Sequence, residues 1–160
     1  MLEFRPATAV DVEALLEFLG DPEVARWLRP AGMEGPFTRT ECETTLARKV
    51  AHWTAHGFGP SFGFVDGRCV GWSILQHTRA TGRSEVEIGW AVISDMWGQG
   101  IATQLGQHAL TGARDLGFER VVAFTRVDNV ASRRVMERLG LQYERDFTYA
   151  GRPHVLYATS

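Results

Sequence analysis

The spacing of apolar residues predicts three helices in the first third of the chain. Within residues 12–19, apolar side chains recur at intervals of three or four, and Gly20 then suits a helix end. Thr38 and Glu41 have the spacing of a capping box, which places another helix start there. The predicted elements are a strand at residues 2–5, stopped by Pro6, and helices at 12–19, from Asp21 to Pro30 and from Thr38 to Gly57.

Strand-like runs follow, and the turn between the first two is well marked. Asp66 and Gly67 stand between two apolar runs, and this pair favours a two-residue hairpin. Three antiparallel strands are therefore expected before the glycine-rich segment that comes next. The predicted strands cover residues 61–65, 69–75 and 84–93, with a loop from 77 to 83.

The second half of the chain alternates helices with strands. A helix from Gly100 to Leu116 is predicted to bury Ile101, Leu105, Ala109 and Ala113. Strand 86–93, this helix and a strand at 121–125 should form a right-handed unit with parallel strands. We therefore expect an α/β fold in one domain spanning residues 1–160, with helices on both faces of a mixed sheet of six or seven strands. The remaining predicted elements are a helix at 129–139 and strands at 141–149 and 154–158.

Composition narrows the classes of partner. The 160 residues suffice for one domain, and a net charge of −2 leaves no basic excess for a nucleic-acid backbone. No apolar run approaches about 18 residues and no signal-peptide pattern is present, so no membrane location is predicted. Cys42 and Cys69 are too few and too scattered for a disulfide framework or a zinc site. A reducing cytoplasm is therefore expected.

His52 and His56 lie four residues apart on the third predicted helix, a spacing that metal ligands also use. The glutamate and the third ligand of a zinc-protease helix are missing. We therefore expect no metal site here and two solvated histidines.

Residues 92–103 combine the end of a strand, two glycines two positions apart and the start of a long helix. Glycines permit a tight turn and a close ligand, and a helix start presents unpaired N–H groups. The segment is a candidate seat for phosphate oxygens, although a plain turn has the same glycines. No G-x-x-x-x-G-K-[ST] occurs, and G-x-G-x-x-G lacks its third glycine at Thr103. A nucleotide triphosphatase or a dinucleotide oxidoreductase is therefore not favoured.

Two motifs in this half of the chain occur together in one family. W-G-Q-G-I-A-T covers Trp97 to Thr103, and N-V-A-S-R-R-V-M-E-R-L-G-L covers Asn129 to Leu141. The pair resembles the acyl-CoA pyrophosphate loop and the N-x-x-S helix of the Gcn5-related N-acetyltransferase (GNAT) family. The opening R-P-A-T-A-V-D-V-E-A-L, Arg5 to Leu15, resembles the branch that includes the ribosomal-protein alanine N-acetyltransferases. The resemblance covers nearly the whole chain, is weakest over residues 30–60, and implies a mixed α/β fold.

The resemblance implies an acetyl-CoA site along these motifs. Backbone N–H groups at the strand end would bond the pantetheine and polarise the acetyl carbonyl, and those of the glycine loop would meet the pyrophosphate. Asn129 would contact the pantetheine arm, but it also has the place of a helix cap, for which Asp128 competes. Gln99 stands where many relatives have lysine or arginine, so modest cofactor affinity is expected. The implied cofactor residues are Val92, Ile93, Ser94, Trp97, Gly98, Gln99, Gly100, Ile101, Ala102, Thr103, Asn129 and Ser132.

Acyl transfer from a thioester to an amine needs a neutral amine, a polarised carbonyl and a hydrogen-bond donor for the departing thiolate. Glu87 is the candidate base, because a carboxylate inside a covered strand needs a cleft or a partner, and Glu85 lies nearer the open strand end. A half-exposed, solvated glutamate is the alternative. The resemblance implies Ser132 as donor to the thiolate, and a first-turn serine without a role is the alternative. Tyr143 and Tyr149 are the other candidate donors.

The leading hypothesis is an acetyl-CoA-dependent N-acetyltransferase that works by direct attack in a ternary complex. Its acceptor would be a protein N-terminal amine or a small amine. The second hypothesis is a non-catalytic, CoA-binding sensor or regulatory module of the same fold. The presence of both Glu87 and Ser132 favours the enzyme. The acceptor's identity and the formation of a homodimer stay open.

Overall fold

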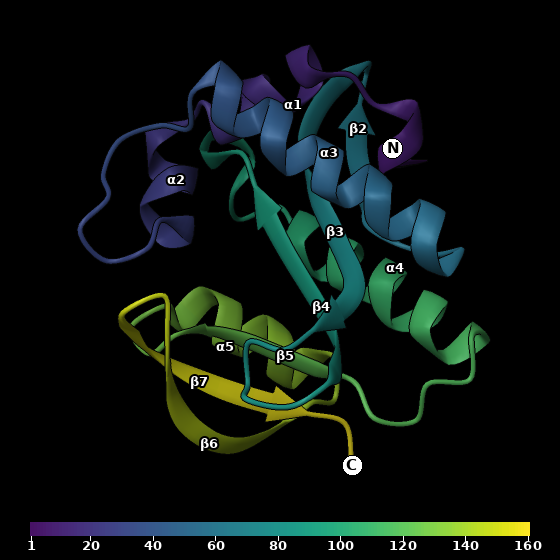
Figure 1. Ribbon diagram of the computed structural model, residues 1–160, viewed down its shortest axis with the longest axis vertical. Coiled ribbons are helices and arrows are strands. Elements are labelled where there is room, and N and C mark those ends of the chain that lie inside the picture. Colours follow the sequence, from purple (N-terminus) through teal and green to yellow (C-terminus); the bar gives the residue numbers. More distant parts are fainter.

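A seven-stranded mixed sheet in the order β1-β2-β3-β4-β5-β7-β6 forms the centre of the computed structural model, which describes residues 1–160 (Figure 1). The prediction of an α/β fold is confirmed. The strands are β1 (Glu3–Pro6), β2 (Ser61–Val65), β3 (Arg68–Thr78), β4 (Glu85–Val92), β5 (Val122–Arg126), β6 (Gln142–Tyr149) and β7 (Arg152–Ala158). The helices are α1 (Val12–Leu19), α2 (Pro22–Leu28), α3 (Arg39–His56), α4 (Ile101–Asp115) and α5 (Val130–Arg138), with 3₁₀ turns η1 (Ala7–Ala9) and η2 (Ser94–Met96).

Strands β1 to β4 pair antiparallel, and their turns follow local sequence signals. Asp66 and Gly67 have positive φ angles of 49° and 79°, as a two-residue hairpin turn requires. Strand β3 continues past the predicted end at Leu75, because it pairs with β4 as far as Thr78 and Glu85. Long-range pairing therefore extends this strand beyond its local pattern.

Strands β4 and β5 are parallel neighbours that pair over very little of their length. Glu87 and Val122 are their paired residues, and beyond them the strands diverge (Figure 1). Strand β5 then pairs antiparallel with β7, which in turn pairs with β6. The sheet therefore consists of two wings, β1–β4 and β5–β7–β6, joined near Glu87.

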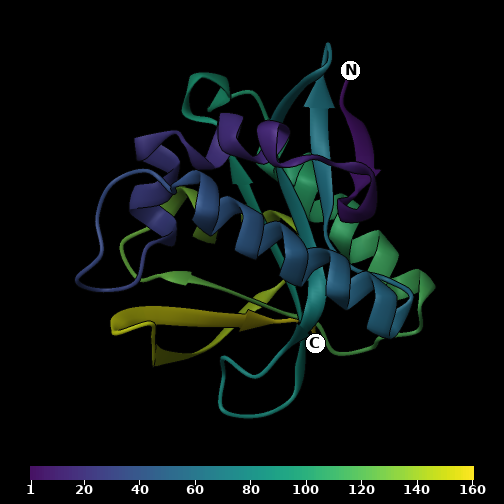
Figure 2. The same ribbon diagram turned by 45° about the horizontal axis from the view of Figure 1, so that its top comes forward.

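Helices cover both faces of the sheet, as predicted (Figure 2). Helix α4 packs on one face, where the hydroxyl of Ser73 donates to the carbonyl of Leu105 at 2.7 Å. Helices α1 and α3 cover the opposite face, where Phe18 packs edge-on against Trp72 with ring centroids 5.2 Å apart. The four residues predicted to point inward from α4 are buried: Ile101, Leu105, Ala109 and Ala113. None of the helices combines the length and the apolar character needed to cross a bilayer.

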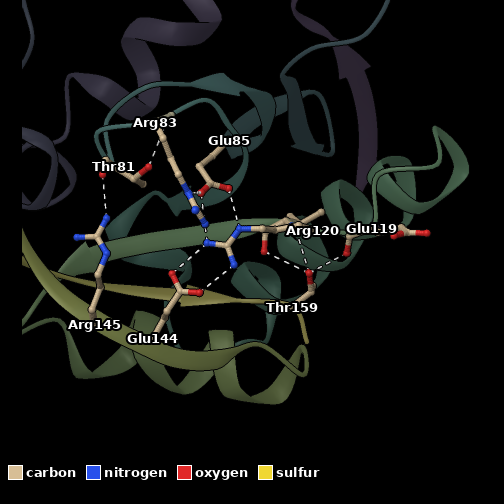
Figure 3. Close-up of polar contacts among 9 residues, drawn as sticks. Thr81, Arg83, Glu85, Glu119, Arg120, Glu144, Arg145 and Thr159 are labelled. Carbon is tan, nitrogen blue, oxygen red and sulfur yellow. Dashed lines mark hydrogen bonds and ion pairs between the residues drawn. The ribbon is translucent and has the colours of Figure 1, made fainter.

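An ion-pair network around the buried Glu85 joins the two wings where β4 meets β5 (Figure 3). The side chain of Glu85 is 3% exposed and accepts hydrogen bonds from Arg83 and Arg120. Arg120 also donates to Glu144 on β6 at 2.8 and 3.0 Å. Burial opposes ionisation of Glu85, but the two guanidinium groups outweigh it and hold the pKa of this carboxyl below its ordinary value. The expectation that Glu85 lies at an open strand end is therefore wrong, because Arg120 covers it.

Candidate functional site

A cleft of about 1330 Å³ lies where β4 and β5 part. The glycine loop and the first turn of α4 form one end, α5 lines one side, and α2 and α3 form the other end. Ile93, Ser94 and Gln99 do not line it. The predicted site residues that the cleft brings together are Glu87, Val92, Trp97, Gly98, Gly100, Ile101, Ala102, Thr103, Asn129 and Ser132.

The glycine loop presents a row of free backbone donors. The first N–H of α4 with a protein acceptor belongs to Gln104, and the N–H groups of residues 98–103 have none. Gly98 and Gly100 have φ angles of 78° and 77°, which favour glycine, and no side chain caps α4. These donors and the positive end of the helix dipole are suited to bind a phosphate or pyrophosphate.

The end of β4 supplies one further backbone donor. Ile93 donates its N–H to Val70 at 2.8 Å, which makes these opposite residues a hydrogen-bonded pair of the β3–β4 ladder. Hydrogen-bonded and non-bonded pairs alternate in an antiparallel ladder, so the preceding residue, Val92, directs its N–H away from β3. The N–H of Val92 therefore points toward β5, which has diverged from β4 and is not paired with Val92.

Ile93 and Ser94 are corrections to the predicted pantetheine donors. The N–H and the hydroxyl of Ser94 both donate to Oδ2 of Asp21, at 2.8 and 2.6 Å. The N–H of Ile93 is engaged with Val70. Neither residue therefore has a free N–H for a ligand.

Trp97 is a further correction, because its backbone N–H donates to the carbonyl of Ser94 at 3.2 Å, whereas the N–H of Gln99 is free as predicted. The indole N–H of Trp97 donates to the carbonyl of Val92 at 2.7 Å, so this side chain fastens the loop to the end of β4. The amide of Gln99 lies 4.0 Å from the sulfur of Met96, outside the cleft lining. The loop therefore offers backbone donors but no charged side chain.

Asn129 and Ser132 begin helix α5 beside the cleft. Asn129 is the N-cap, because its Oδ1 accepts the N–H of Ser132 at 3.3 Å, and Asp128 does not take this place. The cap uses the side-chain oxygen of Asn129 and leaves its amide NH₂ free. The half-buried Ser132 lines the cleft, and its hydroxyl has no protein partner. The hydroxyl is therefore available to a ligand.

Glu87 is half-buried, faces the cleft, and belongs to a chain of three polar side chains. Its Oε1 accepts from the amide of Gln76 at 3.1 Å, and Oε1 of that amide accepts from Nζ of Lys49 at 3.1 Å. Burial raises the pKa of Glu87, although Gln76, Lys49 and Thr78 act in the opposite direction. A partnered carboxyl with a raised pKa differs from the solvated glutamate that was the alternative.

The two candidate tyrosines lie in different surroundings. Tyr143 is exposed and donates its hydroxyl to Asp146 at 2.7 Å, outside the cleft. Tyr149 lines the cleft, and burial together with the negative charge of Glu87 raises its pKa. Tyr149 is therefore the tyrosine that can compete with Ser132 as a proton donor.

The prediction of two solvated histidines is wrong for His52. Its Nδ1 lies 2.9 Å from the carbonyl of Phe58, and its Nε2 accepts the N–H of His77 at 2.9 Å. Both ring nitrogens are therefore occupied by backbone groups, which ties the end of α3 to β3. His56 is exposed.

Lys49, Arg48 and Gln76 line the cleft and were not singled out from the sequence. Lys49 has a detectable signal, because it lies at helical spacing among the apolar residues of α3, Leu46, Val50 and Trp53. A lysine within an apolar stripe needs a polar neighbour in the fold. Gln76 has no such signal, since only the strand register places it opposite Glu87.

Comparison with known proteins identifies the family. The family model described as an acetyltransferase (GNAT) domain matches residues 1–142. This chain belongs to the GNAT acetyltransferase family.

Known relatives and solved structures agree with this assignment. FsC-acetyl coenzyme A-N(2)-transacetylase of Aspergillus fumigatus is 31% identical over 159 residues, which cover 91% of this chain and 64% of that protein. A putative GnaT-family acetyltransferase from Bordetella pertussis has a TM-score of 0.82 at 24% identity, covering 99% of this chain and 95% of its own. RimL, a ribosomal L7/L12 alpha-N-protein acetyltransferase in complex with coenzyme A, has a TM-score of 0.74 at 22% identity, with 98% and 92% covered. These likenesses to solved structures show the shared fold.

Proposed function

We propose that this protein is an N-acetyltransferase that moves an acetyl group from acetyl-CoA to a primary amine, within a single domain spanning residues 1–160. One observation carries the proposal. The free N–H groups of residues 98–103, the free N–H of Val92 and the carboxyl of Glu87 line one cleft, between strands that have parted. A phosphate seat, a carbonyl-polarising donor and a base are the parts that acyl transfer from a CoA thioester requires.

In the proposed complex, the pyrophosphate of acetyl-CoA lies on the N–H groups from Gly98 to Thr103. The loop has no cation for it, since Gln99 is neutral and lies outside the cleft lining. Arg134 and Arg138 on α5 are exposed, line the same cleft and have no acidic partner. We assign them the charge contacts to the cofactor phosphates that the loop itself lacks.

The residues divide the chemistry among them. Glu87 accepts the proton of the acceptor amine, directly or through a water, and the neutral nitrogen attacks the acetyl carbonyl carbon. The N–H of Val92 stabilises the negative charge on the carbonyl oxygen while the carbon–nitrogen bond forms. Ser132 donates a hydrogen bond to the sulfur as the carbon–sulfur bond breaks, so CoA leaves as the thiolate. The proton that the attacking nitrogen loses protonates this thiolate through the solvent, which gives the thiol and the amide. The free amide of Asn129 contacts the pantetheine arm.

The acceptor is proposed at the α3 end of the cleft, because Glu87 faces that end. Both a protein N-terminus and a small amine are compatible with a cleft that is open to solvent. One relative is named for a ribosomal protein and another for FsC, so the relatives' names do not agree on one acceptor.

The competing function is a CoA-binding module without catalysis. An assay of free thiol release from acetyl-CoA across a panel of primary amines separates the two, with mass spectrometry of the acetylated amine as confirmation. The proposal predicts thiol release that depends on both the amine and the protein. Saturable acetyl-CoA binding without acetylation of any amine would support the module instead.

A further inference from the structure

The acceptor end of the cleft contains two cations that lack a carboxylate partner, Lys49 and Arg48 on α3. The nearest hydrogen-bond partner of Lys49 Nζ is the neutral amide oxygen of Gln76 at 3.1 Å, and this nitrogen lies 5.2 Å above the ring of Trp72. The guanidinium of Arg48 lies 3.4 Å from the hydroxyl of Thr45. Neither group forms a salt bridge with an acidic side chain.

Other cations that line this part of the cleft are neutralised. Arg29 pairs with Glu41, Arg26 with Glu23 and Arg126 with Asp128. At the acceptor end, the α3 pair is therefore the one that lacks an acidic partner; Arg134 and Arg138, which also lack one, lie on α5.

Lys49 is a partly buried lysine that has no anionic partner, which is unusual. It is half-buried, it lies in the apolar stripe of α3, and burial lowers its pKa. Glu87 is its nearest acidic group, but Gln76 separates the two. In the proposed reaction Glu87 is directed at the acceptor amine, so it cannot also neutralise both Lys49 and Arg48. A partly desolvated charge without a counter-ion is costly, and a bound anion removes that cost.

We propose that the acceptor is an amine that also carries a carboxylate, which binds to Lys49 and Arg48 while the amine faces Glu87. This inference rests on the proposed function and narrows its acceptor to one chemical class. The carboxylate has two sources, the side chain of an acidic first residue in a peptide or the α-carboxylate of a free amino acid. The ring of Trp72 beneath Lys49 provides an apolar wall for the carbon skeleton between the two groups.

The test measures kcat/KM for thiol release with matched acceptors. A short peptide amide that begins with Asp is compared with one that begins with Asn, since these differ in one charge at nearly equal shape. A free α-amino acid is compared with its carboxamide at neutral pH, where Lys49 carries its charge, and each rate is divided by the neutral fraction of its amine. This comparison distinguishes the two sources of the carboxylate. We expect the carboxylate member of at least one pair to react about tenfold faster, and 0.5 M salt to reduce this ratio.

Substitutions of Lys49 and Arg48 test whether these two residues cause the preference for a carboxylate. Lys49→Gln and Arg48→Gln should each lower the carboxylate-to-amide ratio severalfold, and Lys49→Arg should keep it. Arg114→Gln, an exposed arginine on α4 outside the cleft, is the matched control and should leave the ratio unchanged. Thermal unfolding of each variant shows that the fold is intact.

The outcomes separate the inference from the function on which it rests. Equal or faster acetylation of the uncharged member in both pairs overturns the inference and leaves the N-acetyltransferase standing. A carboxylate preference that survives in Lys49→Gln and Arg48→Gln also overturns it, because the preference then has another origin. Failure to acetylate any amine overturns the proposed function and the inference with it.

Discussion

Asp21 and Ser94 join the wall of the acceptor end to the loop at the cofactor end. One oxygen of Asp21 caps α2 by accepting the N–H of Glu23 at 2.9 Å. The other accepts both the N–H and the hydroxyl of Ser94, at 2.8 and 2.6 Å. A single carboxylate therefore fixes α2 and η2 relative to each other, although 73 positions separate the two residues.

Replacement of Asp21 by Ala should lower the free energy of unfolding by about 2 kcal/mol, since it removes a helix cap and leaves the N–H of Ser94 without an acceptor. Urea unfolding measures this. Asp95→Ala is the matched control, because Asp95 pairs with Arg68 on the surface, with side chains 59% and 43% exposed. It should cost at most about 1 kcal/mol. Equal losses in the two variants would show that the bridge between α2 and η2 contributes little.

The stability of the protein should fall as the pH drops below neutral, partly through His52. Burial lowers the pKa of this histidine, and His56 and His77 add to the shift. The unfolded chain binds a proton near pH 6.5, whereas the folded chain resists it, because Nε2 accepts the N–H of His77. The contribution of His52 to the free energy of unfolding is therefore fully present above about pH 6.5 and decreases as the pH falls below that value.

Measurements of unfolding free energy between pH 5 and pH 8 test this assignment. His52→Gln should flatten the dependence on pH, beyond any uniform loss of stability. His56→Gln, an exposed neighbour on the same helix, should change the slope less. If the slope of His52→Gln equals that of the wild type, the pH dependence would be assigned to the other histidines whose pKa values are lowered, His77, His108 and His154.

Gly100→Glu should abolish acetyl-CoA binding, because it places a negative side chain at the positive start of α4, where the space is now open. Gly117→Glu is the matched control. Gly117 follows the other end of the same helix and has a similar φ angle of 84°, so the backbone strain of the two variants is comparable. Titration calorimetry should show lost affinity in the first variant and retained affinity in the second. If both variants retained their affinity for acetyl-CoA, the assignment of the glycine loop as its binding site would be wrong.

Ser132→Ala should lower kcat by roughly tenfold to a hundredfold with little change in acetyl-CoA affinity, because the thiolate is already a good leaving group. Tyr149→Phe is the informative comparison, since Tyr149 lines the same cleft. A loss of rate in Tyr149→Phe without a loss in Ser132→Ala would assign the proton donor to the tyrosine.

Local signals account for much of the fold. The capping box of Thr38 and Glu41 forms as predicted, and so does the hairpin turn at Asp66 and Gly67, because each depends on residues close in sequence. Regular apolar spacing also gave the buried face of α4 correctly. Strand ends were less accurate, because pairing with a neighbour extends β3 beyond its apolar run.

The errors in the site arise from long-range contacts. The residues next to Ser94 in the sequence give no sign that its N–H is engaged. The packing of α2 brings the carboxylate of Asp21 to this N–H. The burial of Glu85 depends in the same way on Arg120, which is 35 positions away. Sequence motifs located the glycine loop and α5, but the α3 wall has no motif, and the position of Lys49 in an apolar stripe did not indicate its polar neighbour, Gln76.

The pH dependence of acetyl transfer in the wild type and in Glu87→Gln tests the central claim most directly. With an N-terminal amine as acceptor, the amine has a pKa near 8 and is about one-tenth neutral at pH 7. We predict acetylated product from the wild type, and in Glu87→Gln a large loss of rate at pH 7 that recovers in part as the pH passes the pKa of the amine. A deficit that stays constant into strongly alkaline solution, or no deficit at any pH, would contradict the assignment of Glu87 as the base.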